Sequence, residues 1–153
     1  MNSRGFTLVE LIITMVLIGV LAVTVVPRFL GSAAEDAYML RDRTLAMMRA
    51  IQLESMHNVN SSNCVKISST LIAPPAGRDC ANAASTAFDD YLVIDSSASG
   101  ITFTTTNNQG VNFTSLAFDS WGKPNVDCSA TCKVAIANQA VCVSAEGLIY
   151  ACN

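Results

Sequence analysis

The pattern of apolar and polar positions divides the chain into a helical N-terminal part and a strand-rich remainder. Residues 6–27 are apolar almost without interruption, and Glu10 is the one charged residue among them. A run of about 20 apolar residues has the length of a helix that crosses a bilayer. We therefore expect residues 6–27 to form a transmembrane helix, preceded by a short polar leader, residues 1–5.

A helical spacing continues beyond Pro27. Small or apolar residues recur at intervals of four and three on one helix face, namely Ala33, Ala37, Leu40, Thr44, Met47 and Ile51. The pattern predicts a single helix over about residues 7–57, whose second half, residues 28–57, is amphipathic. Gly19 and Pro27 are its weak points, because glycine is flexible and proline lacks an amide hydrogen. A kink or local unwinding is expected around residues 23–27.

Residues 58–153 contain short alternating or β-branched segments separated by turn residues. The expected strands are residues 65–72, 91–94, 101–106, 111–118, 133–137, 140–145 and 148–152, with a short helix at residues 81–88. Strands that follow one another at short intervals favour an antiparallel sheet, and the amphipathic helix can cover one of its faces. The predicted fold class is therefore α+β, with a long N-terminal α-helix packed on a globular β domain.

Composition excludes several classes of function. The net charge is −3 and the pI about 4.9, so the overall balance gives no sign of nucleic-acid binding. The chain has one histidine, His57, and no phosphate-binding glycine loop. Asp89 and Asp90 are adjacent, and adjacent residues of a strand point to opposite faces. We expect no enzyme activity, no catalytic residues and no cofactor.

Six cysteines lie beyond the apolar run, which favours disulfides in an oxidising compartment. Six cysteines allow 15 pairings, and the sequence does not choose among them rigorously. Proximity favours the set Cys64 with Cys80, Cys128 with Cys132, and Cys142 with Cys152. The third pair has the most support, because a turn at Glu146-Gly147 would bring the last two strands together.

Metal sites are the rival interpretation of these residues. Cys128 and Cys132 have a spacing compatible with a zinc knuckle, but no second close cysteine pair exists. Calcium at Asp119 and Asp127 is conceivable, although the twelve-residue acidic loop of an EF-hand is absent. We expect no metal site.

The N-terminus carries the most specific signal. A carboxylate inside an apolar membrane segment is costly and by default functional, so Glu10 needs a partner. Cleavage after Gly5 would create one, because Phe6 would then carry a protonated amine four residues before Glu10. An ordinary signal peptide is the alternative, but its only cleavage candidate, at residues 21–23, is weak. A plain signal anchor of about 20 residues is a second alternative.

The stretch Gly5-Phe-Thr-Leu-Val-Glu10 resembles the processing site of type IV prepilins and pseudopilins. The resemblance implies that a prepilin peptidase cuts after Gly5, that Phe6 is methylated, and that Glu10 helps to draw the subunit into a fibre. It also implies a pilin fold. The partners would be other pilin subunits, the pilus assembly platform and the membrane. The chain would begin as a single-pass inner-membrane protein with a periplasmic C-terminal domain, and end in a pilus at the cell surface.

The segment Phe118-Asp-Ser-Trp-Gly-Lys-Pro124 resembles one common in pilin-like proteins. We expect Trp121 to anchor a loop, Gly122 to turn it and Pro124 to stop strand pairing. Together with the cysteine-closed last hairpin, it makes the chain similar to a minor prepilin of the mannose-sensitive haemagglutinin pilus, a fibre used in attachment. The alternatives are a type II secretion pseudopilin and, from another class, a signal-anchored periplasmic binding domain.

Overall fold

The computed structural model describes residues 7–29, 33–58 and 63–152, without the side chains of residues 22–29 and Ala33. The chain divides into two units, residues 1–32 and residues 33–153. None of the helices within the described ranges combines the length and the apolar character needed to cross a membrane. The fold class is α+β, as predicted.

The described residues contain two helical stretches within the range of the single helix expected at residues 7–57, and its continuity remains a prediction. Helix α1 spans Leu8–Phe29 and helix α2 spans Ala33–His57, and the residues between them are outside the described part. The backbone of α1 is helical through Gly19 and Pro27, so the unwinding expected at residues 23–27 is not observed. A kink at Gly19 or Pro27 remains a prediction.

The buried face of α2 coincides with the predicted helical spacing. Ala37, Leu40, Thr44, Met47 and Ile51 are all buried, whereas the charged side chains between them are exposed or half-buried. Met48 and Ser55 widen the same face. Full burial of a Leu, Ile or Met side chain contributes roughly 1.5–3 kcal/mol, so this stripe is a main source of stability for the second unit.

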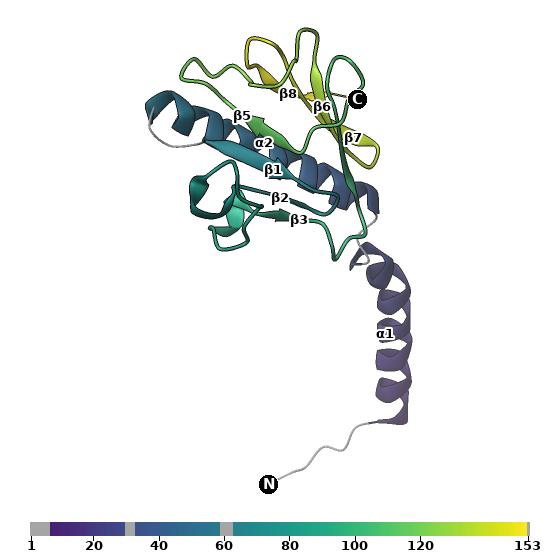
Figure 1. Ribbon diagram of the computed structural model, residues 1–153. Coiled ribbons are helices and arrows are strands. Elements are labelled where there is room, and N and C mark those ends of the chain that lie inside the picture. The colour runs from purple at the N-terminus through teal and green to yellow at the C-terminus, as the bar shows by residue number, and fades with distance from the viewer. Residues whose placement is uncertain (1–6, 30–32, 59–62, 153) are drawn as a thin grey trace. The chain divides into compact units, whose positions relative to one another are not determined.

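The strands form two four-stranded antiparallel sheets instead of one sheet (Figure 1). The first has the order β3-β2-β1-β5, with β1 at Cys64–Ile67, β2 at Leu71–Ala73, β3 at Ile94–Asp95 and β5 at Ser115–Ala117. The second has the order β4-β6-β7-β8, with β4 at Phe103–Thr106, β6 at Cys132–Ile136, β7 at Gln139–Val143 and β8 at Ile149–Cys152. Short 3₁₀ helices lie at Ala76–Arg78 (η1) and Asp90–Leu92 (η2).

Three of the expected elements differ from the structure. The strand expected at residues 65–72 is a hairpin of β1 and β2, in which the Ser68 hydroxyl accepts the Leu71 amide at 3.0 Å. The helix expected at residues 81–88 is wrong, because this segment folds back on residues 74–76 and Ala84 pairs with Pro75. The strand expected at residues 91–94 is replaced by η2 and β3. In each case a contact to another segment overrides the local preference.

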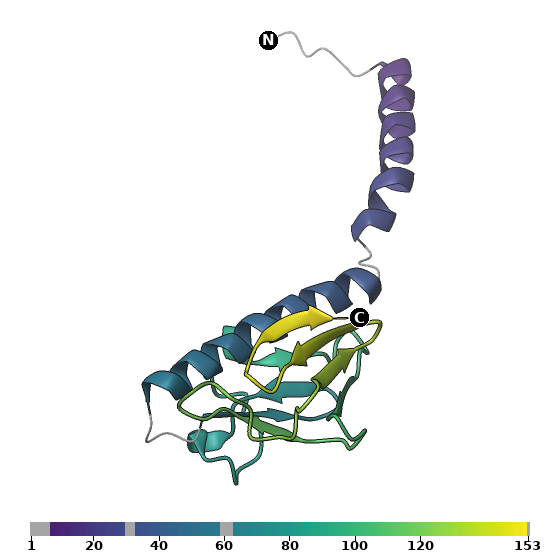
Figure 2. The ribbon, with the colours of Figure 1, turned by 90° about the horizontal axis from the view of Figure 1, so that it is seen from above.

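Helix α2 lies against both sheets and joins them into one core (Figure 2). It contacts β7 and β8 on one side and β1 and β3 on the other. Met47 and Met48 belong to a single cluster with side chains of both sheets, such as Val65, Leu116 and Val141. The helix and the two sheets therefore share one hydrophobic core.

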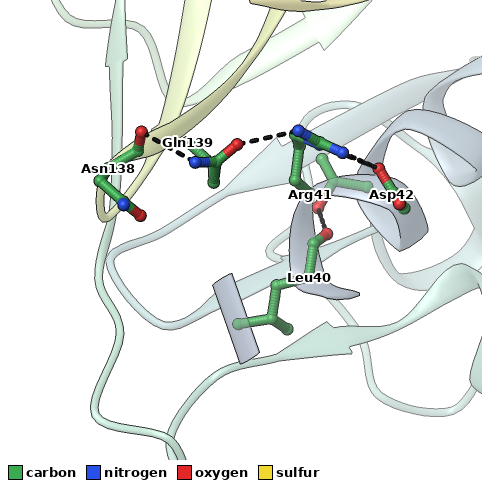
Figure 3. A network of polar contacts seen from close by, with 6 residues as sticks. Leu40, Arg41, Asp42, Asn138 and Gln139 are labelled. Atoms are coloured by element: carbon green, nitrogen blue, oxygen red, sulfur yellow. Dashed lines mark hydrogen bonds and ion pairs between the residues drawn. The ribbon is translucent and has the colours of Figure 1, made fainter. Parts of the chain in front are cut away.

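Polar contacts fix the N-terminal half of α2 on the β6–β7 turn (Figure 3). The Arg41 guanidinium donates to the Gln139 side-chain oxygen at 2.8 Å and pairs with Asp42 at 2.8 Å. The Gln139 amide in turn donates to the carbonyl of Asn138 at 3.2 Å. The Thr44 hydroxyl is buried in the core and donates to the Leu40 carbonyl at 2.7 Å, so it carries no unpaired donor.

The six cysteines form three disulfides: Cys64–Cys80, Cys128–Cys132 and Cys142–Cys152. These are the pairs that proximity in the sequence favoured. The last pair links β7 and β8 diagonally, because Cys142 lies opposite Tyr150 and Cys152 lies opposite Ala140. All three disulfides restrain residues of the two sheets or of the loops attached to them, so they stabilise the globular unit.

Two turns meet the C-terminal part of α2 at a tight junction. The Gln52 side chain donates to the carbonyl of Gly122 at 2.7 Å and to the carbonyl of Gly147 at 2.6 Å. Both glycines have positive φ, +78° and +88°. A Cβ atom on Gly147 would lie 2.1 Å from the Gly122 carbonyl oxygen. Glycine is required at Gly147 both for its backbone conformation and for this close approach.

We predict that Gly147→Ala destabilises the protein by roughly 3 kcal/mol or more, because it combines backbone strain with a clash against backbone atoms. Gly110→Ala is the matched control, since Gly110 has φ +76° and open space around its Cβ position. The control should lower the free energy of unfolding by only about 1 kcal/mol, which is the cost of a left-handed backbone conformation for a non-glycine residue. Thermal unfolding of the full chain in detergent measures the loss of stability in both variants. Equal losses for Gly147→Ala and Gly110→Ala would contradict the close-packed junction.

Candidate assembly surface of the N-terminal helix

Helix α1 begins shortly after the predicted processing site in the sequence, at Leu8. The Thr7 hydroxyl accepts the backbone amide of Glu10 at 3.3 Å, and the Thr7 carbonyl accepts the amides of Glu10 and Leu11. Thr7 is therefore the N-cap of α1, and Glu10 holds the position of the acidic residue in a capping box. Gly5 and Phe6 lie outside the described residues, so their expected cleavage and methylation are not tested.

Glu10 lies in the first turn of α1 and its side chain is exposed. A carboxylate is favourable there, because the first turn of a helix carries partial positive charge. Among the described residues, no ion pair involves Glu10. The amine proposed as its partner belongs to Phe6 and lies outside the described part, so this pairing remains a prediction.

The described side chains of α1 expose apolar surface on every side of the helix. Eleven large apolar side chains are 49% to 74% exposed, namely Leu8, Val9, Leu11, Ile12, Ile13, Met15, Val16, Leu17, Ile18, Val20 and Leu21. A helix that is apolar all round is stable only when lipid or other protein surrounds it. The arrangement can therefore bind a membrane or a bundle of similar helices.

The segment at residues 118–124 differs in one respect from the sequence prediction. Trp121 does not anchor the loop, because its side chain is 80% exposed. Asp119 holds the loop instead, since its carboxylate accepts the backbone amides of Trp121 at 2.9 Å and Lys123 at 2.8 Å. Gly122 makes the turn with positive φ, as expected. Short polar side chains commonly close turns in this way. In the sequence, Asp119 is therefore the residue that indicates this turn.

Neighbouring charges at this loop are paired at the surface. Lys123 and Glu146 form an ion pair at 2.8 Å, and both side chains are well exposed. The hydrogen bond and charge of Glu146 raise the pKa of Lys123 above its ordinary value. Exposed ion pairs of this kind contribute little to stability. We therefore infer that the Lys123–Glu146 pair mainly holds its two turns in their relative position.

Asp119 and Asp127, the pair considered for calcium, make hydrogen bonds within the protein. Asp127 accepts the Gln109 side-chain amide at 2.7 Å and the Ser129 backbone amide at 3.1 Å. Across the described ranges, no three His, Cys, Asp or Glu side chains gather as a metal site would require. His57 is the last residue of α2 and is exposed.

Comparison with known proteins gives two matches and one negative result. Residues 1–26 match the family model described as the prokaryotic N-terminal methylation motif, a range that includes Gly5, Phe6 and Glu10. Over 105 residues the chain is 30% identical to the type IV narrow pilus major component PilA5 of Thermus thermophilus. This alignment covers 68% of the chain and 87% of that protein. No solved structure matches the chain.

We predict that Thr7→Val loosens the start of α1, because it removes the side-chain hydroxyl oxygen that accepts the Glu10 amide. Loss of an N-cap costs about 1 kcal/mol, so hydrogen exchange of the Glu10 amide should become about fivefold faster in detergent micelles. Thr14→Val is the control, since the Thr14 hydroxyl donates to the Leu11 carbonyl within the helix and caps nothing. Equal exchange rates in the wild-type chain and Thr7→Val would contradict the capping assignment.

Proposed function

The chain belongs to the type IV pilin family, and we propose that it is a structural subunit of a surface fibre, cut after Gly5 and methylated at Phe6. The observation that carries the proposal is α1, a helix with apolar side chains exposed on every side and one carboxylate, Glu10, in its first turn. Membership of this family points to a structural protein and not to an enzyme.

Before assembly, the proposal places residues 6–27 in the inner membrane and the globular unit on the periplasmic side. Its support is the apolar run of the sequence, in which residues 11–26 carry no charge. The three disulfides of the globular unit fit an oxidising compartment. A prepilin peptidase would release residues 1–5, and the assembly platform would then receive the mature chain.

During assembly, Glu10 would pair with the methylated amine of Phe6 on a neighbouring subunit. A lone carboxylate in an apolar medium is costly, whereas a carboxylate beside a cation is much less so. The charge pair therefore favours the fibre over the membrane monomer. The apolar side chains of α1 would bundle with those of neighbouring subunits and form the core of the fibre.

The kind of fibre is a finer proposal. The sequence features favour a minor prepilin of the mannose-sensitive haemagglutinin pilus, which would act in attachment. The relative from Thermus thermophilus is named as a major component. The number of copies of this chain per fibre would therefore distinguish a minor subunit from a major one. A type II secretion pseudopilin has the same N-terminal features and is the second candidate. Neighbouring genes for pilus motors or for a secretin and exoproteins would separate the two.

We predict that mass spectrometry of the membrane fraction detects a mature chain that begins with N-methylated Phe6. The comparison is between cells with and without the prepilin peptidase, and the mature form should appear only when the peptidase is present. An uncut Met1 in both, or a terminus near Val23, would contradict the proposal. Either result would instead favour a signal-anchored or secreted disulfide-bonded domain.

We predict that Glu10→Gln lowers the amount of the chain in sheared fibres at least tenfold while cleavage after Gly5 continues. Glutamine keeps the shape of the side chain and its place in the capping box but removes the charge that would pair with the amine. Glu10→Ala and Glu10→Val should behave in the same way. Immunoblots of sheared fibres and of membranes measure the two pools, and normal incorporation of Glu10→Gln would contradict the charge-pair mechanism.

A further inference from the structure

Four exposed apolar side chains lie around the junction between α2 and the two turns. They are Leu53 (57% exposed), Met56 (47%), Trp121 (80%) and Leu148 (64%), and we refer to them as the Trp121 ridge. Met56 lies beside the turn that carries Trp121, because a Cβ on Gly122 would lie 3.2 Å from the Met56 sulfur. Leu53 and Leu148 line one shallow groove. Clustered exposed apolar side chains of this size mark an interaction surface.

The backbone beneath the ridge is rigid. The Gln52 amide holds the carbonyls of Gly122 and Gly147, and the Asp119 carboxylate holds the amides on either side of Gly122. The Ser55 hydroxyl adds a bond to the Asp119 carbonyl at 3.2 Å. An exposed tryptophan on a fixed loop loses little conformational freedom on binding, and tryptophan is among the residues most enriched in interface hot spots.

A groove of about 240 Å³ lies at the other end of α2. Its walls are Asp36, Met39 and Leu40 of α2 together with Asp95, Ala98 and Ser99 from the end of β3 and the turn that follows. Ligand pockets usually run from about 300 to 1,000 Å³, so this groove suits a single large side chain better than a free ligand. Met39 is 58% exposed and supplies an apolar wall.

The groove carries negative charge. The amide of Ser97 donates to the Asp95 carboxylate at 2.8 Å and lowers the pKa of Asp95, so this group is ionised at neutral pH. Asp36 is the second carboxylate of the groove. Arg43 lies on the same side of α2, where its guanidinium donates to the carbonyls of Asp90 and Val93.

The ridge and the groove lie on opposite flanks of the globular unit. The ridge adjoins β8 and the groove adjoins β3, and Figure 1 shows these two strands on either side of α2. Met39 and Leu53 are about 21 Å apart along the axis, at 1.5 Å per residue. Arg49 lies beside the ridge, is exposed, and donates to the Ile149 carbonyl at 2.7 Å. The ridge is thus apolar with Arg49 and the Lys123–Glu146 ion pair beside it, a net charge of one cation, whereas the groove is apolar with two carboxylates.

We propose that the Trp121 ridge of one copy of this chain docks in the Met39 groove of the next copy. The indole ring of Trp121 would lie on Met39 and Leu40, and Arg49 would approach Asp36 and Asp95. Contacts between two different patches of the same chain repeat from copy to copy, and they build a filament when the rotation between copies does not close into a ring. The inference rests on the proposed fibre function. It requires copies of this chain to be neighbours in the fibre, so it belongs to a subunit present in many copies and not to the minor prepilin that the sequence features favour. The opposite charges of the two patches set the register of the contact.

The experiment places a photo-crosslinking amino acid at residue 121 of the full chain in cells that assemble fibres. We expect crosslinked dimers in sheared fibres, with peptide mapping that joins residue 121 to residues 36–40 or 95–99 of a second copy. The same amino acid at Val111, which is 57% exposed and outside both patches, is the matched control and should give at least fivefold less dimer. Fibres that contain the chain but crosslink residue 121 to another protein, or to other residues, would overturn the docking and leave the fibre function intact. A chain absent from fibres altogether would contradict both.

Charge-reversal variants show whether a lower crosslinking yield comes from loss of the proposed contact or from misfolding of the variant. Asp36→Arg and Arg49→Asp should each reduce the crosslinked dimer at least fivefold, because each places like charges together across the contact. The double variant exchanges the two charges and should restore the yield to within twofold of the unmodified pair. A double variant no better than the single variants would overturn the proposed register.

Discussion

The globular unit depends on one constraint: a single helix face must cover two sheets at once. Met47 and Met48 are fully buried in a cluster to which both sheets contribute, and the Thr44 hydroxyl in the same face is satisfied by the Leu40 carbonyl. Within the described residues of the globular unit, α2 is the one α-helix. The apolar stripe of α2 is therefore the common support of the whole unit.

The described side chains of α1 expose apolar surface in all directions, whereas the globular unit builds its core with α2. A bilayer or a bundle of helices would remove the apolar surface of α1 from water. Glu10 then decides between these environments, because its charge is costly in lipid and tolerable beside a cation.

The turns of the globular unit are held rigid by local contacts. Three disulfides and a junction of two glycines under Gln52 fix turns that bury little apolar surface themselves. Rigid turns can hold an exposed tryptophan in one place, and among the large apolar side chains that the structure describes Trp121 is the most exposed. The same segment thus contributes to stability through its backbone and to binding through its side chain.

The sequence by itself determined the N-terminal motif, the α+β class and the buried face of α2, because local spacing dictates which residues of a helix share a side. The strands from Cys132 to Cys152 were also predictable, since they are short segments rich in apolar residues that turn residues separate. Only the tertiary structure decided that the strands form two sheets, that residues 65–72 form a hairpin, and that Trp121 faces solvent. These features depend on contacts between segments far apart in the chain, such as Gln52 with Gly122 and Gly147. Local periodicity shows which side chains are buried but carries no information on which distant segment covers them.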